Sequence, residues 1–423
     1  MTIRLLLLSL VLGAFALRAA GSPLESGDVE LRVSVPGDPL ATDTLQRAID
    51  SMLCGDGVQL VADVDLTLPE GGVFRVAGAY SLFRQPLPGF GAFYGSVRAV
   101  IVDRSGQETL EPGLHEIEAG QWIAVRSRFQ TVALSGIVAG EVDVAIEREN
   151  EPVVTIAPAA GSLKLRAYSG PIESGSLRAA DPVLSKMLFA ALWNWLRWLC
   201  FGMLWLLTTI DGFVGHIGWS IILLSLAVKI LMLPLTKYAD SLQASVNRTQ
   251  ALLQPQIDEI KKNFKGEEAH EKILAVYKQH GVNPLYTMKS LLGFLLQIPI
   301  FIAAFDMLGE NIALDGASLW WIDDLAKPDS WIALPFALPF FGGYLNLLPI
   351  LMTGVTLLTS WKQTDPNLTP ELERAQTQRL YLMAGAFFLL FYTFPAGMVL
   401  YWTTNNVLHL VKITVWGRTS ATV

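Results

Sequence analysis

The fold is decided by residues 218–236, which read GWSIILLSLAVKILMLPLT. This stretch is long enough to cross a lipid bilayer as one helix, and Lys229 near its middle is the only charge. A lysine at that depth costs about 3 kcal/mol on insertion scales. Four residues share one face at helical spacing: Ser225, Lys229, Met232 and Thr236. We predict that Lys229 faces a polar cavity; the alternative is that its long side chain snorkels to the headgroups.

The composition is that of a chain about half embedded in a membrane. Of 423 residues, 52% are hydrophobic and 16% charged, and the mean hydropathy is +0.42. The net charge of -7 argues against nucleic acid as a direct partner. The two cysteines cannot build a disulfide framework, the five histidines show no metal-ligand spacing, and residues 89–95 miss the dinucleotide fingerprint and are interpreted as a loop. No nucleophile stands with a base, so we expect no catalytic residue, cofactor or metal, and a protein that is not an enzyme.

The first 175 residues indicate export followed by a β domain. Residues 5–17 are apolar but too short to span a bilayer, and small residues follow, which predicts a signal peptide over 1–21; an uncleaved anchor is the alternative. Over 22–175 polar and apolar residues alternate in short runs, which predicts an all-β sandwich. The expected strands are 30–35, 63–68, 122–125, 131–134, 141–146, 153–156 and 163–168, and the only expected helix is 43–52. No charged or aromatic cluster marks a ligand site in this domain, and we interpret it as passive.

A linker and an amphipathic helix are predicted for residues 176–217. The small polar stretch at 175–181 is the linker. Residues 182–214 are rich in Trp and Leu and are interrupted by Asn194, Arg197 and Asp211. Such a segment favours a helix lying in the membrane interface, although its length also permits a span.

Lysine and arginine set the orientation of the C-terminal half of the chain. Residues 237–289 carry eight of them, whereas residues 309–331 carry one. The excess places 237–289 in the cytoplasm and the β domain on the periplasmic side. Residues 238–282 are predicted to form a helical hairpin broken at Gly266, either a solvated element or a docking surface for a partner.

Four further spans are expected at 290–308, 345–361, 380–394 and 398–416, giving a five-helix core over 218–416 and a short cytoplasmic tail over 417–423. The third is short, which suggests local thinning of the bilayer or a helix that starts earlier. The last contains a polar run from Thr403 to Asn406 and His409, which is costly unless it faces protein or water.

Several motifs follow one another along the C-terminal half: GWSII at 218–222 with Lys229 and PLTK at 234–237, LQPQI at 253–257, VNPL at 282–285, QIPIF at 297–301, LWWIDDL at 319–325 and FPAGMVLYW at 394–402. In order and spacing they resemble those of the YidC family of membrane protein insertases (the Oxa/Alb/YidC group). The resemblance runs from about 168 to 416, and YSGP at 168–171 resembles the closing strand of the family's periplasmic β-sandwich.

The resemblance implies a polytopic α-helical protein of the bacterial inner membrane that inserts newly made membrane proteins through a hydrophilic groove open to the cytoplasm and to lipid. Lys229 occupies the position of the family's groove arginine, without its bidentate guanidinium. The other expected groove residues are Ser225, Gln297, Tyr401, Trp402, Asn405 and Asn406. Implied partners are nascent membrane proteins, the lipid bilayer, the ribosome and the protein-secretion channel.

A small-solute transporter with an exported binding domain is the alternative function. It would predict an inverted repeat of helices around a midplane site, and five core spans do not divide into equal halves.

Overall fold

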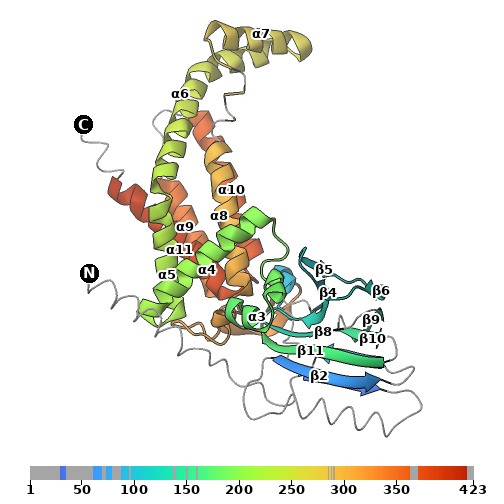
Figure 1. Cartoon of the computed structure of the whole chain (residues 1–423). Coiled ribbons are helices and arrows are strands. Elements are labelled where there is room, and N and C mark those ends of the chain that lie inside the picture. Colours follow the sequence, from blue (N-terminus) through green and yellow to red (C-terminus); the bar gives the residue numbers. More distant parts are fainter. Residues whose placement is uncertain are drawn as a thin grey trace, which may run out of the picture. The chain divides into compact units, whose positions relative to one another are not determined.

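The computed structural model describes residues 29–34, 61–68, 73–78, 87–94, 97–136, 140–148, 151–158, 161–283, 285, 286, 288, 291–362 and 370–416 (Figure 1). The chain divides into two compact units. The β unit runs to Arg197 and includes Gly309–Asp315; the helical unit comprises Trp198–Leu308 and the residues from Gly316 onward. The signal peptide expected at 1–21, the helix expected at 43–52 and the tail at 417–423 lie outside the described residues.

Two antiparallel sheets form the β unit. The first has the order β1-β3-β10-β9-β6 and the second the order β2-β11-β8-β7-β4-β5. The sheets face each other, since β10 lies against β4 and β7. Side chains from both sheets fill the space between them, including Trp122, Leu134, Ile156 and Tyr168. The strands are β1 (Val29–Ser34), β2 (Val61–Leu68), β3 (Val73–Gly78), β4 (Arg98–Val102), β5 (Gln107–Thr109), β6 (Gly113–Ile117), β7 (Trp122–Arg126), β8 (Gln130–Ser135), β9 (Gly140–Arg148), β10 (Glu151–Pro158) and β11 (Gly161–Pro171).

This arrangement confirms the all-β sandwich, and each of the seven expected strands is present. The sequence did not predict β3, β4, β5 or β6. Strand β4 is buried on both faces and therefore does not alternate, while β5 has three residues and no apolar one. Residues 89–94, interpreted as a loop, form a short 3-10 helix.

The segment after the last strand is more ordered than expected. Residues 175–181, predicted as a small polar linker, lie mostly in helix α3 (Ser174–Ala180), and a 3-10 turn follows at Pro182–Met187. The predicted amphipathic helix does not run from 182; it is α4 (Asn194–Val214). Asp181 ends α3 and caps the next turn, because its carboxylate accepts the backbone N–H of Val183 at 2.8 Å.

A buried ion pair fixes residues 309–315 within the β unit. Arg126 on β7 is 8% exposed, and its guanidinium lies 3.3 Å from the Glu310 carboxylate. That carboxylate also accepts the backbone N–H of Phe189 at 2.9 Å. Arg128 donates its Nε–H to the carbonyl of Gly309 at 2.6 Å. The last two residues of helix α8 are thus held by two arginines from the sandwich.

The helical unit is built from long helices joined by a loop region with one β-hairpin. Helix α11 packs against both α5 and α9, and α10 packs against α9. The elements are α4 (whose first four residues belong to the β unit), α5 (Ile217–Leu231), α6 (Leu233–Asn263), α7 (Gly266–Gln279), α8 (Leu291–Glu310, whose last two residues belong to the β unit), β12 (Ile332–Leu338), β13 (Gly342–Leu345), α9 (Leu347–Lys362), α10 (Pro370–Phe391) and α11 (Ala396–Trp416).

The stretch 218–236 is not one helix, which corrects the prediction. Helix α5 ends at Leu231 and α6 starts at Leu233, with a bend of 59° between them. Pro234 in the first turn of α6 has no backbone N–H to continue the ladder of α5. Met232 and Thr236 therefore do not extend the face that carries Ser225 and Lys229.

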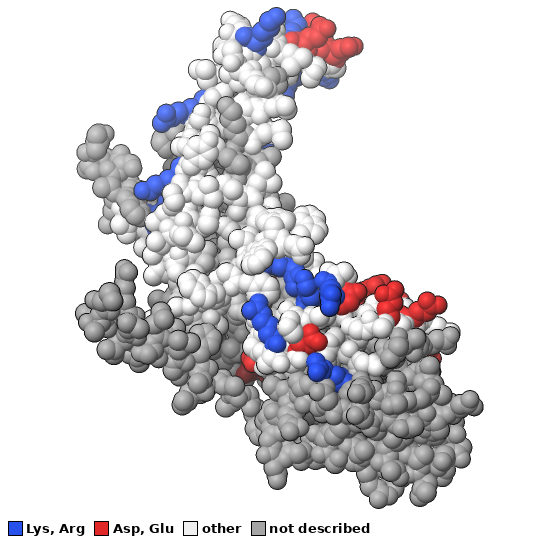
Figure 2. Space-filling model, viewed as in Figure 1, with Lys and Arg blue, Asp and Glu red and all other residues white. Residues whose placement is uncertain are grey.

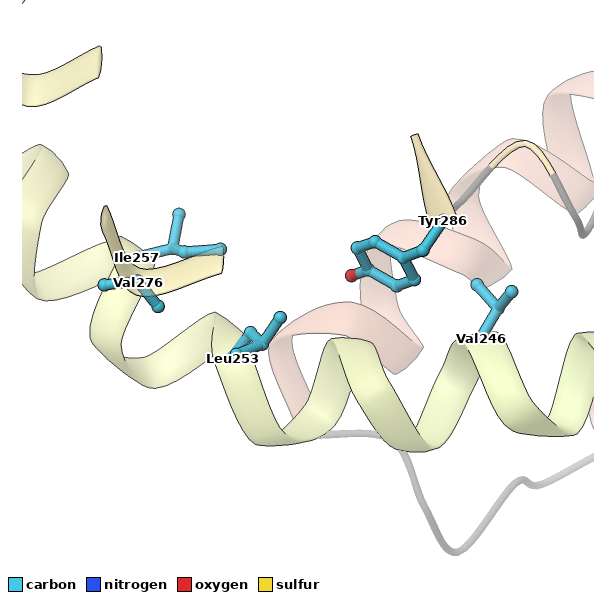
Figure 3. Packing of buried hydrophobic residues seen from close by; sticks show 5 residues of the cluster. All are labelled: Val246, Leu253, Ile257, Val276 and Tyr286. Carbon is cyan, nitrogen blue, oxygen red and sulfur yellow. The ribbon is translucent and has the colours of Figure 1, made fainter. Parts of the chain in front are cut away.

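The helical hairpin is confirmed as α6 followed by α7, with the break at Phe264 and Lys265 just before Gly266, whose φ is +66°. In Figure 1, α7 lies at the far end of the long helix α6. A small apolar cluster joins them: Val246, Leu253, Ile257, Val276 and Tyr286 (Figure 3). Burial raises the pKa of the Tyr286 phenol in this cluster. Lysines and glutamates gather at the far end of the hairpin (Figure 2), as its dipoles favour.

The other helices match the expected segments closely, and α10 does start earlier than 380. Within the described residues, α4 is long and apolar enough to cross a membrane, and α5 with α6 would count as a second crossing if the bent pair is taken as one. Helix α9 and residues 377–391 of α10 are apolar but shorter. The number of spans stays a prediction.

Candidate functional site

The contact between α5 and α11 brings several of the expected polar residues together. Ser225 on α5 is fully buried, and its hydroxyl donates to the carbonyls of Ile221, at 3.1 Å, and of Tyr401 on α11, at 3.2 Å. The bond within α5 follows the usual back-bonding of serine in helices. The bond to Tyr401 crosses between helices, a type of contact worth about 0.6 kcal/mol on average in membranes.

One turn further along α5, Lys229 approaches the same helix. Its ammonium lies 3.5 Å from the backbone carbonyl of Asn405, and the side chain is partly buried. The side chain of Asn405 bonds within α11, because its amide donates to the Tyr401 carbonyl at 3.1 Å. No carboxylate lies within 4.0 Å of the Lys229 ammonium among the residues that the structure describes. The Asn405 carbonyl is therefore the hydrogen-bond acceptor for Lys229, and no direct ion pair neutralises its ammonium among the described residues.

On the other side of α11, Asn406 reaches α9. Its amide donates to the hydroxyl of Thr356 at 2.9 Å, and that hydroxyl donates in turn to the Met352 carbonyl at 2.9 Å. Thr356 is a contact that sequence reasoning missed. Threonines recur at 353, 356 and 359 in an apolar helix, and this spacing was an available signal. We call Ser225, Lys229, Asn405, Asn406 and Thr356 the polar seam.

Two of the expected residues on α11 play different structural parts. Tyr401 is 3% exposed, and it contributes its backbone carbonyl to the seam. Trp402 lies among phenylalanines rather than polar groups. Its ring centroid is 4.8 Å from that of Phe301, on α8, in an edge-to-face arrangement, and 5.6 Å from that of Phe387, on α10, at an interplanar angle of 45°.

Gln297 is not brought to the seam. It lies exposed on α8, and no hydrogen bond joins it to Lys229 or to the asparagines in the described part of the chain. Helix α8 meets α11 through the phenylalanine face instead, with Phe301 and Phe305 at 4.8 and 6.3 Å from the Trp402 ring.

One ion pair that sequence reasoning missed lies two turns beyond the seam. The Lys412 ammonium, on α11, is 2.6 Å from the Asp240 carboxylate, on α6. It joins α11 to the base of the hairpin just beyond the bend at Met232. The two residues lie 172 positions apart, so no local sequence pattern connects them.

A sequence model of the family described as 60Kd inner membrane protein matches residues 209–421, about half of this chain. The match covers the helices that build the polar seam. The chain therefore belongs to this family of inner membrane proteins.

Named relatives agree with that assignment. The chain is 31% identical to the membrane protein insertase YidC of Janthinobacterium sp. (strain Marseille) over 264 residues, which are 62% of this chain and 44% of that protein. It is 33% identical to the YidC insertase of Syntrophobacter fumaroxidans over 254 residues, 59% of this chain and 43% of that one. The matched part thus spans less than half the length of these relatives. A crystal structure of an active YidC insertase with its first transmembrane domain resolved covers 90% of this chain at 19% identity and a TM-score of 0.37, with 82% of that chain covered.

Proposed function

We propose that this protein inserts newly made membrane proteins into the bacterial inner membrane, with the polar seam as the place where the polar flank of a substrate segment is sheltered. The observation that carries the proposal is the position of Lys229: an ammonium on an apolar helix, 3.5 Å from a carbonyl and without a neutralising carboxylate in the described residues. A helix that only had to be stable would carry an apolar residue there, because an unpaired charge in a membrane is costly.

The seam supplies what a crossing polar segment loses when it leaves water. The partly buried Thr356 hydroxyl and the side-chain amides of Asn405 and Asn406 provide donors and acceptors on α9 and α11, beside Lys229 on α5. The apolar part of the substrate would move along the aromatic surface near Trp402 while its flank stays hydrated by the seam. Transfer of this kind changes no covalent bond, so the residues act by binding alone.

The charge gives the seam a preference. An acidic group about 4 Å from the ammonium would gain about 4 kcal/mol at an effective dielectric constant of about 20, before desolvation is counted. Even a third of that gain corresponds to about a tenfold change in rate. We therefore infer that substrates with acidic flanks depend most on Lys229.

The orientation supports the same function. With the basic segment 237–289 in the cytoplasm and the β unit in the periplasm, the hairpin α6–α7 stands on the side where ribosomes deliver nascent chains. We propose the ribosome and the protein-secretion channel as partners of this face. A small-solute transporter gains no support, because the named relatives are insertases.

Protease protection of newly made substrates in vesicles tests the proposal at matched protein levels. We expect Lys229→Ala to accumulate normally but to insert acidic-flank substrates about tenfold more slowly, Lys229→Arg to restore most activity, and Lys229→Glu to be slowest. Neutral-flank substrates should change little. Lys237→Ala, which removes an exposed lysine from the start of α6, is the matched control and should behave as wild type.

A photoreactive residue at position 229 adds an independent readout. Adducts with the nascent chain during translation support insertion, whereas adducts with lipid only contradict it. Equal insertion of acidic-flank substrates by the Ala, Arg and Glu variants would refute the electrostatic step and leave a seam that acts through its uncharged polar groups alone.

A further inference from the structure

The hairpin of β12 and β13 is an apolar ribbon, and six of the seven residues of β12 are exposed. We use the name apolar ribbon for residues 331–345. Its largest side chains are exposed: Phe336 is 64% exposed, Phe340 50% and Trp331 46%. No Asp, Glu, Lys or Arg occurs from Ser330 to Trp361, so the ribbon and the helix that follows it are uncharged over this range.

In water this ribbon would be poorly stable. It has only two strands, paired at Ile332 with Leu345 and at Leu338 with Gly342, and an isolated two-stranded hairpin is marginal at best. Six large apolar or aromatic residues are exposed along it: Trp331, Ile332, Phe336, Leu338, Phe340 and Tyr344. A continuous exposed apolar surface of this kind indicates a contact with a partner or a membrane.

Contacts to Tyr392 place the ribbon at the ends of two apolar helices. The Tyr392 hydroxyl donates to the Tyr344 carbonyl at 3.1 Å, and its ring meets Phe341 edge-on at 5.4 Å. Asn346, directly after β13, donates to the Tyr392 carbonyl at 2.6 Å. Tyr392 follows the last residue of α10, and α9 begins at Leu347. The ribbon is therefore fixed at the level where α10 ends and α9 begins.

The prolines of the ribbon distinguish lipid from a protein partner. Another strand would add to an open edge through its backbone N–H and C=O groups, and Pro335 and Pro339 lack the N–H. The same loss lowers the number of donors that would be left unsatisfied beside lipid. Trp331 and Tyr344 stand near the base of the ribbon, and these residue types concentrate at membrane interfaces.

We propose that the apolar ribbon lies in the interfacial layer of the bilayer, with Phe336 and Phe340 directed into the acyl chains at the ends of α9 and α10. A ribbon with open edges cannot enter the hydrocarbon core fully, because its edge carbonyls would lose their hydrogen bonds. The interface satisfies those groups with water and headgroups while taking up the aromatic side chains. The ribbon thereby anchors the connection between α8 and α9 in the membrane surface.

Nitroxide labels on the full chain in phosphatidylethanolamine vesicles with some phosphatidylglycerol test this placement. Phe336→Cys and Phe340→Cys are each labelled in a Cys54→Ser background. Cys200 is left in place, because it is buried. We expect both labels to collide more often with oxygen, which is enriched in lipid, than with a water-soluble nickel reagent. A label at Leu114→Cys, on a 72% exposed residue of β6, is the aqueous control and should show the reverse order. Aqueous behaviour at 336 and 340, or label–label broadening that disappears on dilution with unlabelled protein, would overturn the proposal.

A second measurement needs no substitution. A phospholipid with a photoreactive group near its glycerol backbone should form adducts within residues 331–345 of the native chain. Adducts on α9 without any on these residues would place the ribbon outside the lipid and refute the inference.

Discussion

The carboxylate of Asp329 starts helix α9 from 18 residues earlier in the chain, and its removal should be among the most damaging single changes outside the seam. Asp329 is 4% exposed. One of its oxygens accepts the backbone N–H groups of Leu347 and Leu348, both at 2.8 Å, and the indole N–H of Trp321 at 3.1 Å. The residue thus works as a remote N-cap and ties the loop 321–329 to the first turn of α9.

The expected cost follows from these three bonds. Hydrogen bonds to a charged group contribute about 1.5–3 kcal/mol each, and a buried N–H left without a partner costs about 1–3 kcal/mol. Because such terms overlap, we expect Asp329→Ala to lower the free energy of unfolding by about 3–5 kcal/mol. Asp329→Asn keeps an acceptor oxygen but loses the charge and should cost about 1–2 kcal/mol.

Unfolding in mixed micelles, followed by far-UV circular dichroism as the fraction of denaturing detergent rises, measures the difference. Asp323→Ala is the matched control: Asp323 is an exposed aspartate of the same loop, and its removal should change stability by less than about 0.5 kcal/mol. If Asp329→Ala and Asp323→Ala unfold at the same detergent fraction, the cap contributes nothing and the reasoning fails.

Two further predictions concern the same loop region. Gly218→Ala should destabilise the helical unit by about 1–3 kcal/mol in the same assay, because the new Cβ would lie 2.9 Å from the Cβ of Leu319, which is 3% exposed. Gly202→Ala is the control and should stabilise α4 slightly, because nothing lies within 4 Å of its new Cβ. Equal stabilities of the two variants would show that Leu319 moves freely. For Asp324, burial opposes ionisation, but the ammonium of Lys327 at 2.8 Å and the backbone N–H groups of Ala326 and Gly316 outweigh it and lower the pKa below 3.8. Because the Asp324 pKa is lower in the folded protein than in the unfolded chain, its ionised carboxylate stabilises the fold at pH values above the unfolded-state pKa, and this stabilisation is lost as the pH falls through the folded-state pKa. Wild type should therefore be more stable than Asp324→Asn at neutral pH, and the difference in stability should close at acid pH below about 3.8. A stability difference that does not depend on pH would contradict this.

Several features of the fold follow from local patterns and were predictable. Strands β1, β2 and β9 alternate polar and apolar residues and are therefore recognisable from the sequence. The break before Gly266 follows from a glycine placed between two helical patterns. Strand β4 is buried on both faces and is an apolar run without period, so only its pairing with β5 and β7 shows that it is a strand.

Part of the candidate site was likewise predictable from local sequence, and part was not. The sequence marked Ser225, Lys229 and the two asparagines, because polar residues within apolar helices are costly and therefore conspicuous. It did not predict that Trp402 joins a phenylalanine cluster, that Gln297 stays apart, or that Thr356 completes the seam. Those outcomes depend on which faces of α8, α9 and α11 pack together. A periodic pattern in the sequence predicts that a helix has an apolar or polar face, but it does not predict which helix packs against that face.

By itself the sequence determined the order of the β and helical parts, the helices of the C-terminal half, the hairpin α6–α7 and the charge within the apolar helix α5, since each rests on spacing within a single segment. The tertiary structure alone decided the remote cap by Asp329 and the pairing of Lys412 with Asp240. Each of these joins groups whose energies depend on distance in space. Residues 172 positions apart meet at 2.6 Å only after the helices between them have packed.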